Sequence, residues 1–77
     1  MSGPSIRVTR DFYAIRVFIN DLLHVHVRTS ELLAVQGWYD HPASMSIEYA
    51  LRGGSMVTEY TDRDKWALIL AGLEGVL

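Results

Sequence analysis

The chain has 77 residues, of which 49% are hydrophobic and 21% charged, with a formal net charge of −2 and no cysteine. A chain of this size forms one domain, because a second core would leave each half too small to fold unaided. The hydrophobic content excludes a disordered chain, and the lack of cysteine excludes a disulfide scaffold and thiolate catalysis.

The first five residues form a short segment without charged side chains. They lack the basic region and apolar run of a signal peptide. The apolar runs elsewhere are only a few residues long, far below the roughly 20 residues that span a bilayer. We therefore expect a flexible N-terminus at residues 1–5, a single domain at residues 6–77, no membrane span and a cytoplasmic location.

Turn residues divide the chain into short segments rich in Val, Ile, Phe, Tyr and Leu, a pattern typical of antiparallel strands. The expected strands cover about residues 6–19, 22–28, 31–39, 45–52 and 55–60. Asn20-Asp21 and Gly53-Gly54 predict two-residue hairpin turns, because these residues tolerate the left-handed region. Thr29-Ser30 is expected to close a third turn, and Pro42 to bend the chain before the fourth strand.

The pattern changes after Thr61, where an apolar stripe at helical spacing is formed by Trp66, Ile69, Leu70 and Leu73. This stripe predicts an amphipathic helix over about residues 62–73. Thr61 and Asp64 have the spacing of a capping box, and Gly72 and Gly75 are suited to end the helix.

Together these elements predict an α+β fold, a small antiparallel five-stranded meander followed by one C-terminal helix. In outline this order resembles small PH-like folds, in which a strongly curved sheet forms a half-barrel. Such a topology hosts many functions, so the resemblance carries no functional weight.

The turns also predict which side chains share a face, since strand residues alternate. Ile19 is expected to pair with Leu22, and Arg28 with Glu31. Both faces of the first three strands are then largely apolar, while one helix covers only one face. We therefore predict a homodimer that covers the other. Its interface is either Ile15, Val17, His24, His26, Leu33 and Val35, or the opposite face with Phe18, Val25, Val27 and Trp38.

The second hairpin shows the alternation of a half-buried sheet. With Gly53-Gly54 as a two-residue loop, its apolar side consists of Met45, Ile47, Tyr49, Leu51, Met56 and Tyr60. Its polar side consists of Ser46, Glu48, Arg52, Ser55 and Glu59. We expect the apolar side to pack on the core and the polar side to meet water.

The histidines are the most distinctive candidates for chemistry. On the predicted register, His24 and His26 point the same way from one strand, and His41 lies in the following loop beside Asp40. Three imidazoles could hold a zinc ion. Among aliphatic neighbours, buried or interfacial histidines are the commoner outcome, and their protonation would then weaken a dimer in mildly acidic solution.

No motif for catalysis is present. No serine stands in a Gly-x-Ser-x-Gly elbow, and the segment Arg52-Gly53-Gly54-Ser55 leads into a strand instead of the helix that follows a phosphate loop. We expect neither enzymatic activity nor a cofactor. Four arginines spread between Arg7 and Arg28 do not make the clustered basic surface of a nucleic-acid binder, so nucleic acid is not an expected partner.

The sequence thus predicts a small non-enzymatic protein-interaction or assembly module that forms a homo-oligomer. A free sheet edge offers a second contact surface for a protein partner. The alternative function is a small metal- or ligand-binding protein that uses His24, His26 and His41.

Overall fold

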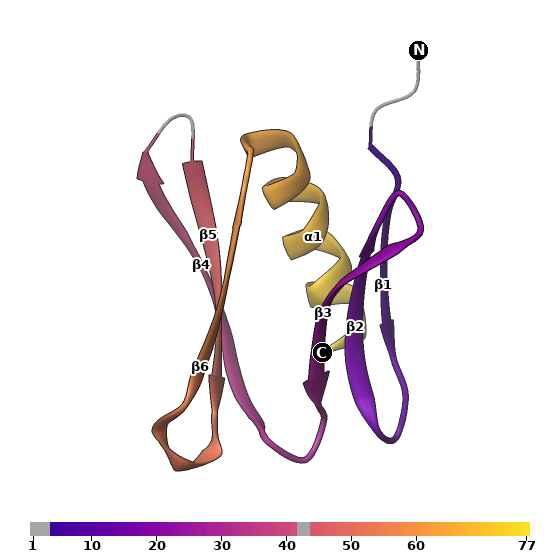
Figure 1. Ribbon diagram of the computed structural model, residues 1–77, viewed down its shortest axis with the longest axis vertical. Helices are drawn as coiled ribbons and strands as arrows, with labels where there is room; N and C mark the ends of the chain where they lie inside the picture. The colour runs from indigo at the N-terminus through magenta and orange to yellow at the C-terminus, as the bar shows by residue number, and fades with distance from the viewer. Residues whose placement is uncertain (1–3, 42–43) are drawn as a thin grey trace.

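The computed structural model describes residues 4–41 and 44–77, with only the backbone described at residues 39–41 and 44. Within these ranges the fold is α+β, as predicted. The elements are β1 (Ile6–Arg10), β2 (Ala14–Ile19), β3 (Leu22–Arg28), β4 (Leu32–His41), β5 (Ser44–Leu51), β6 (Met56–Thr61) and α1 (Arg63–Val76). The strands form two antiparallel sheets, β1-β2-β3 and β4-β5-β6 (Figure 1). The structure therefore differs from the predicted single five-stranded meander, and the half-barrel curl is not confirmed.

The predicted first strand, residues 6–19, is divided into β1 and β2 by a turn at Asp11. The Oδ1 atom of Asp11 accepts hydrogen bonds from the backbone N–H groups of Tyr13 at 2.7 Å and Ala14 at 2.8 Å. Aspartate favours turns because its side chain can accept hydrogen bonds from nearby backbone N–H groups. In a continuous strand these N–H groups would bond to the neighbouring strand instead. The chain therefore reverses, and β1 pairs with β2, with Val8 opposite Val17.

The turn between β2 and β3 confirms the prediction at Asn20 and Asp21. Both residues have positive φ, 51° and 65°, and Ile19 lies opposite Leu22. The backbone N–H of Ser5 donates to Oδ1 of Asn20 at 3.0 Å, which ties this turn to the start of β1. Of the predicted flexible segment 1–5, residues 1–3 lie outside the described residues.

A β-bulge next to this turn changes the faces of β3. The register shifts between Val17 and its neighbour, so that Val17 lies opposite Val25 instead of His24. A one-residue shift exchanges the two sides of a strand. Val25 and Val27 therefore enter the core at 5% and 3% exposure, while His24 and His26 are exposed.

The turn predicted at Thr29-Ser30 is confirmed, since the backbone N–H of Glu31 donates to the carbonyl of Arg28 at 3.0 Å. No hairpin ladder follows the turn, and residues 29–31 join the two sheets instead. The backbone N–H of Thr29 donates to the carbonyl of Tyr13 at 3.0 Å, which holds the segment to the first sheet. The N–H of Arg52 donates to the carbonyl of Glu31 at 2.8 Å, which holds it to the second. Because β3 and β4 belong to different sheets, the predicted cross-strand pairing of Arg28 with Glu31 does not form.

The hairpin of β5 and β6 is confirmed, but its loop is one residue longer than predicted. Leu51 donates its backbone N–H to the carbonyl of Ser55 at 2.9 Å. Residues 52–54 make a short 3-10 turn in which Gly53 and Gly54 have φ of 82° and 86°. Since strand side chains alternate, this difference turns over every side chain of β6.

Helix α1 begins at the N-cap Asp62, whose side chain accepts a hydrogen bond from the backbone N–H of Lys65 at 3.0 Å. It continues to Val76, through the two glycines that were expected to end it. A Cβ atom at Gly72 would lie 2.6 Å from Cγ2 of Val8, so glycine permits the close approach of α1 to β1. In the described ranges, no helix is long and apolar enough to cross a membrane.

The two sheets and the helix share one core, with α1 lying across the inner faces of both sheets (Figure 1). The predicted helix stripe is confirmed, since Ile69 and Leu73 are 0% and 1% exposed. Trp66 and Leu70 pack against the same core, and Trp66 donates its indole N–H to the carbonyl of Ser46 at 2.9 Å. The buried cluster consists of Ile15, Val17, Ile19, Val25, Val27, Ile47, Tyr49, Ile69 and Leu73.

Candidate functional site

A buried carboxylate, that of Glu59 in β6, lies on the inner face of the second sheet. The longer β5–β6 loop places Glu59 opposite Ile47, on the side that faces the core. Its side chain is 9% exposed. Glutamate is rarely buried unless a partner replaces the water it loses, because an uncompensated buried charge is costly. The surroundings of Glu59 therefore define the first candidate site.

Tyr49 provides one partner for this carboxylate. Its Oη atom donates a hydrogen bond of 3.0 Å to Oε1 of Glu59, and Tyr49 itself is fully buried. The second oxygen, Oε2, is also buried and has no hydrogen-bond partner among the described residues. The core thus satisfies one of the two oxygens of this carboxylate.

The surroundings of Glu59 and Tyr49 raise the pKa of both side chains above the ordinary values. Burial raises the pKa of Glu59, against the opposing effects of the Tyr49 hydrogen bond and the nearby His24. Burial, followed by the negative charge of Glu59, raises the pKa of Tyr49. Tyr49 therefore acts as a hydrogen-bond donor at neutral pH and does not serve as a base.

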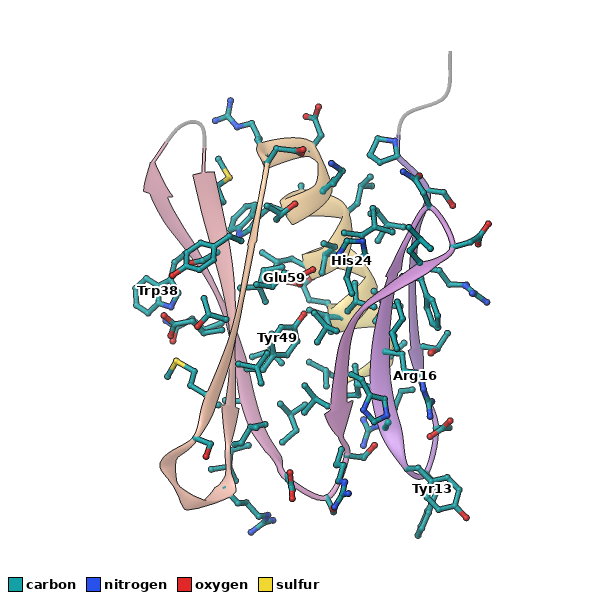
Figure 2. All side chains as sticks on the ribbon, in the orientation of Figure 1. Tyr13, Arg16, His24, Trp38, Tyr49 and Glu59 are labelled. Atoms are coloured by element: carbon teal, nitrogen blue, oxygen red, sulfur yellow. The ribbon has the colours of Figure 1, made fainter. Side chains whose placement is uncertain are left out.

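His24 faces Glu59 from the other sheet. Figure 2 shows the two side chains in the space between β3 and β6. They line a groove of about 280 Å³, whose walls are His24 and Val25, residues 57–61 of β6 and the first turn of α1. The bulge in β3 is what turns His24 toward this groove, because His24 is the extra residue between the positions paired with β2.

At the rim of the groove, Lys65 and Asp62 form an ion pair. Nζ of Lys65 lies 3.0 Å from Oδ2 of Asp62. The backbone N–H of Lys65, followed by its side chain, lowers the pKa of Asp62. The positive charge of Lys65 is thus already directed to Asp62.

The groove is bordered by two strands that end their sheets. β3 is one of the two outermost strands of the first sheet, and β6 is one of the two outermost strands of the second. No backbone hydrogen bond joins β3 to β6 in the part of the chain that the structure describes. An outermost strand carries a row of N–H and C=O groups that can pair with another chain.

A second, wider hollow of about 910 Å³ lies at the other end of the first sheet, beside the β1–β2 turn. Phe12 and Tyr13 project from this turn at 88% and 74% exposure, with ring centroids 5.3 Å apart in an edge-to-face arrangement. His26 and Arg28 line the same hollow. Its surface is basic and aromatic, in contrast to the buried acid of the groove.

The predicted metal ligands are not assembled by the described residues. His24 lines the groove and His26 lines the wider hollow, so the two side chains serve different surfaces. The side chain of His41 lies outside the described part of the structure. Within that part, no group of three or more His, Cys, Asp or Glu side chains is placed to hold a metal ion. Metal binding that involves His41 stays a prediction.

Neither of the two predicted interface sets forms one face, because the bulge in β3 and the separation of the sheets rearrange them. Core positions are taken by Ile15, Val17, Val25 and Val27. Exposed positions are taken by His24, His26, Leu33 and Trp38. Phe18 and Val35 are half-buried.

The sequence reasoning missed Glu59 and Tyr49 as a pair, since it placed Glu59 on the solvent side of the hairpin. The one signal that bears on this point is the length of the Gly-rich turn. A three-residue loop at Arg52-Gly53-Gly54 predicts the observed side for Glu59, whereas a two-residue loop predicts the opposite side.

Comparisons with known proteins found no match: no protein-family model, no curated protein and no solved structure matches the chain.

Proposed function

We propose that the chain is a small non-enzymatic protein-interaction module that takes up an extended segment of a partner protein between β3 and β6. The observation that supports this function is that two outermost strands, one from each sheet, border a single groove. Extended segments add to sheet edges through main-chain hydrogen bonds, and side-chain pockets give the selectivity.

The groove suits this mode of binding because it offers both kinds of contact. Its edges supply backbone groups on two sides, so a segment lying between β3 and β6 would pair with both sheets at once. Its walls supply apolar contacts at Val25 and Val57 and polar contacts at Thr58 and Glu59. Compared with a segment bound to a single sheet edge, a segment held on two sides loses more conformational freedom. It also gains roughly twice the number of main-chain hydrogen bonds, each worth about 1 kcal/mol.

Self-association forms the assembly part of the proposal and uses an adjoining surface, the outer face of the second sheet, which shares Tyr60 with the groove. Here Trp38 and Tyr60 flank Ser46 in one row of paired residues. Tyr60 is 73% exposed, and Met56, four residues away on the same face of β6, is 54% exposed. Aromatic residues and Met are enriched where proteins associate. A second copy of the chain is the occupant that we propose for this face.

The groove is tested by selecting random nonapeptides on phage against the full chain and mapping the selected peptides by NMR on the isotope-labelled protein. We expect amide shift changes in β3 and β6. Methylation of either alternate set of peptide nitrogens should weaken binding strongly, because a segment lying between two edges donates alternately to β3 and to β6. Shift changes confined to the outer faces of the sheets, or the absence of any selected peptide, would contradict the proposal.

A further inference from the structure

We propose that the groove selects segments that carry a lysine or arginine, and that Glu59 binds the cationic group. This inference rests on the proposed function, because the cation is delivered by a segment lying between β3 and β6. It goes further by naming the side chain that the groove recognises and the residue that recognises it.

The first argument is the incomplete hydrogen bonding of Glu59. Oε1 accepts the 3.0 Å bond from Tyr49, but Oε2 is buried with no hydrogen-bond partner in the described ranges. Buried polar atoms are nearly always paired, and each unpaired one weakens the fold. A donor brought by a partner would complete the set, so binding would remove an existing penalty as well as add a contact.

The second argument is charge. The charged or titratable groups that line the groove with Glu59 are His24, Tyr60, Asp62 and Lys65. The lysine is held by Asp62 at 3.0 Å, so these two charges offset each other. Among the described residues that line the groove, Glu59 is then the acidic group that has no ion-pair partner. A charged donor matches a carboxylate better than a neutral one, since charge-assisted hydrogen bonds are roughly twice as strong.

The third argument is register. Glu59 points to the inner face of the second sheet, and Val25 points to the inner face of the first. A strand between β3 and β6 would place every second side chain on that same inner face, and directly opposite neighbours lie about 5 Å apart at Cβ. One side chain of the segment would therefore stand beside Glu59. A long basic side chain can lie along the apolar wall while its cationic end reaches the carboxylate.

The test uses the peptides selected against the full chain. We expect a lysine or arginine at one fixed position in them. Its replacement by norleucine, which keeps an unbranched apolar stem but lacks the cationic end of the side chain, should weaken binding about tenfold or more. With the Glu59→Gln protein, the original peptide should bind as weakly as the norleucine peptide, and the two peptides should no longer differ. The matched control is Glu74→Gln, an exposed position of α1 outside both proposed binding surfaces, which should retain the full preference for the charged peptide.

The outcomes separate this inference from the function on which it rests. If peptides bind at β3 and β6 but norleucine costs nothing, the recognition of a cation is wrong while the interaction function stands. If no peptide binds there, both are wrong. If Glu59→Gln does not fold, which its circular dichroism spectrum reports, Glu59→Asp takes its place. This variant keeps the charge but shortens the side chain by one methylene, and it should reduce the difference between the two peptides; an unchanged difference would contradict the role of Glu59.

Discussion

Tyr49 and Glu59 are diagonal neighbours on the inner face of the second sheet, and the 3.0 Å hydrogen bond between them lies inside the core. Both residues are nearly inaccessible to water. Burial of this ionisable group among aliphatic side chains costs stability, and its Oε2 atom has no hydrogen-bond partner among the described residues.

The first prediction concerns the pH dependence of stability. Because burial raises the pKa of Glu59, the folded protein holds this proton more tightly than the unfolded chain does. The contribution to the free energy of unfolding is fully present below the ordinary carboxyl range and is lost as pH rises through the raised pKa. Urea unfolding of Glu59→Gln between pH 4 and pH 8 should lack this decline. An equal decline in the variant would contradict the assignment to Glu59.

The second prediction concerns Asp11 and has the opposite sign. The hydrogen bond from the N–H of Ala14, followed by that from Arg16, lowers the pKa of Asp11 to about 2. The stability that Asp11 contributes is present above the ordinary carboxyl range and is lost as pH falls toward 2. Acid unfolding should therefore be shallower in Asp11→Asn, which starts from a lower stability at neutral pH. Asp21→Asn is the control and should keep the wild-type slope.

The third prediction compares two glycines of α1. At Gly72 an added Cβ would lie 2.6 Å from Cγ2 of Val8, whereas at Gly75 it would meet nothing within 4 Å. Gly75→Ala should stabilise the protein by about 0.5–1 kcal/mol through helix propensity. Gly72→Ala should destabilise it by about 1–3 kcal/mol through overpacking. Thermal unfolding measures both, and adding Val8→Ala to Gly72→Ala should recover part of the loss.

The fourth prediction concerns self-association. Sedimentation velocity over a range of concentrations should show a dimer that Tyr60→Lys weakens at least tenfold, because the substitution removes an exposed aromatic ring from the contact between two copies and places a charge on each. Phe12→Lys, at the exposed tip of the first sheet, is the matched control and should leave the dimer unchanged. A wild-type chain that is monomeric at every concentration would exclude this assembly.

The sequence predicted the elements whose signals are local. Asn20 and Asp21 mark a turn by their tolerance of positive φ, and the spacing of Trp66, Ile69 and Leu73 marks the buried side of α1. Short-range rules suffice for these features, because the side chain and the backbone that it affects are only a few residues apart.

The faces of the strands could not be predicted in the same way. A bulge at His24 and one extra loop residue before Ser55 each move the register by a single position. Each such step exchanges the buried and exposed sides of a whole strand. Because the sequence did not reveal the extra loop residue before Ser55, the buried carboxylate of Glu59 was assigned to the surface. The division into two sheets depends on the turn at Asp11 and on contacts of residues 29–31 with distant segments. The hydrophobic periodicity of the sequence carries no information about such contacts.

The contact between Gly72 and Val8 has a consequence for the order of folding during synthesis. Of the described elements, β1 is synthesised before the others and α1 after them, yet the inner side of the first sheet is covered by that helix. The hairpins form from neighbouring residues and can close early, while the packing of α1 on β1 requires closure of most of the chain. The apolar side of the nascent first sheet therefore stays uncovered until translation has passed α1, which makes this interval the one in which the chain is most prone to aggregate.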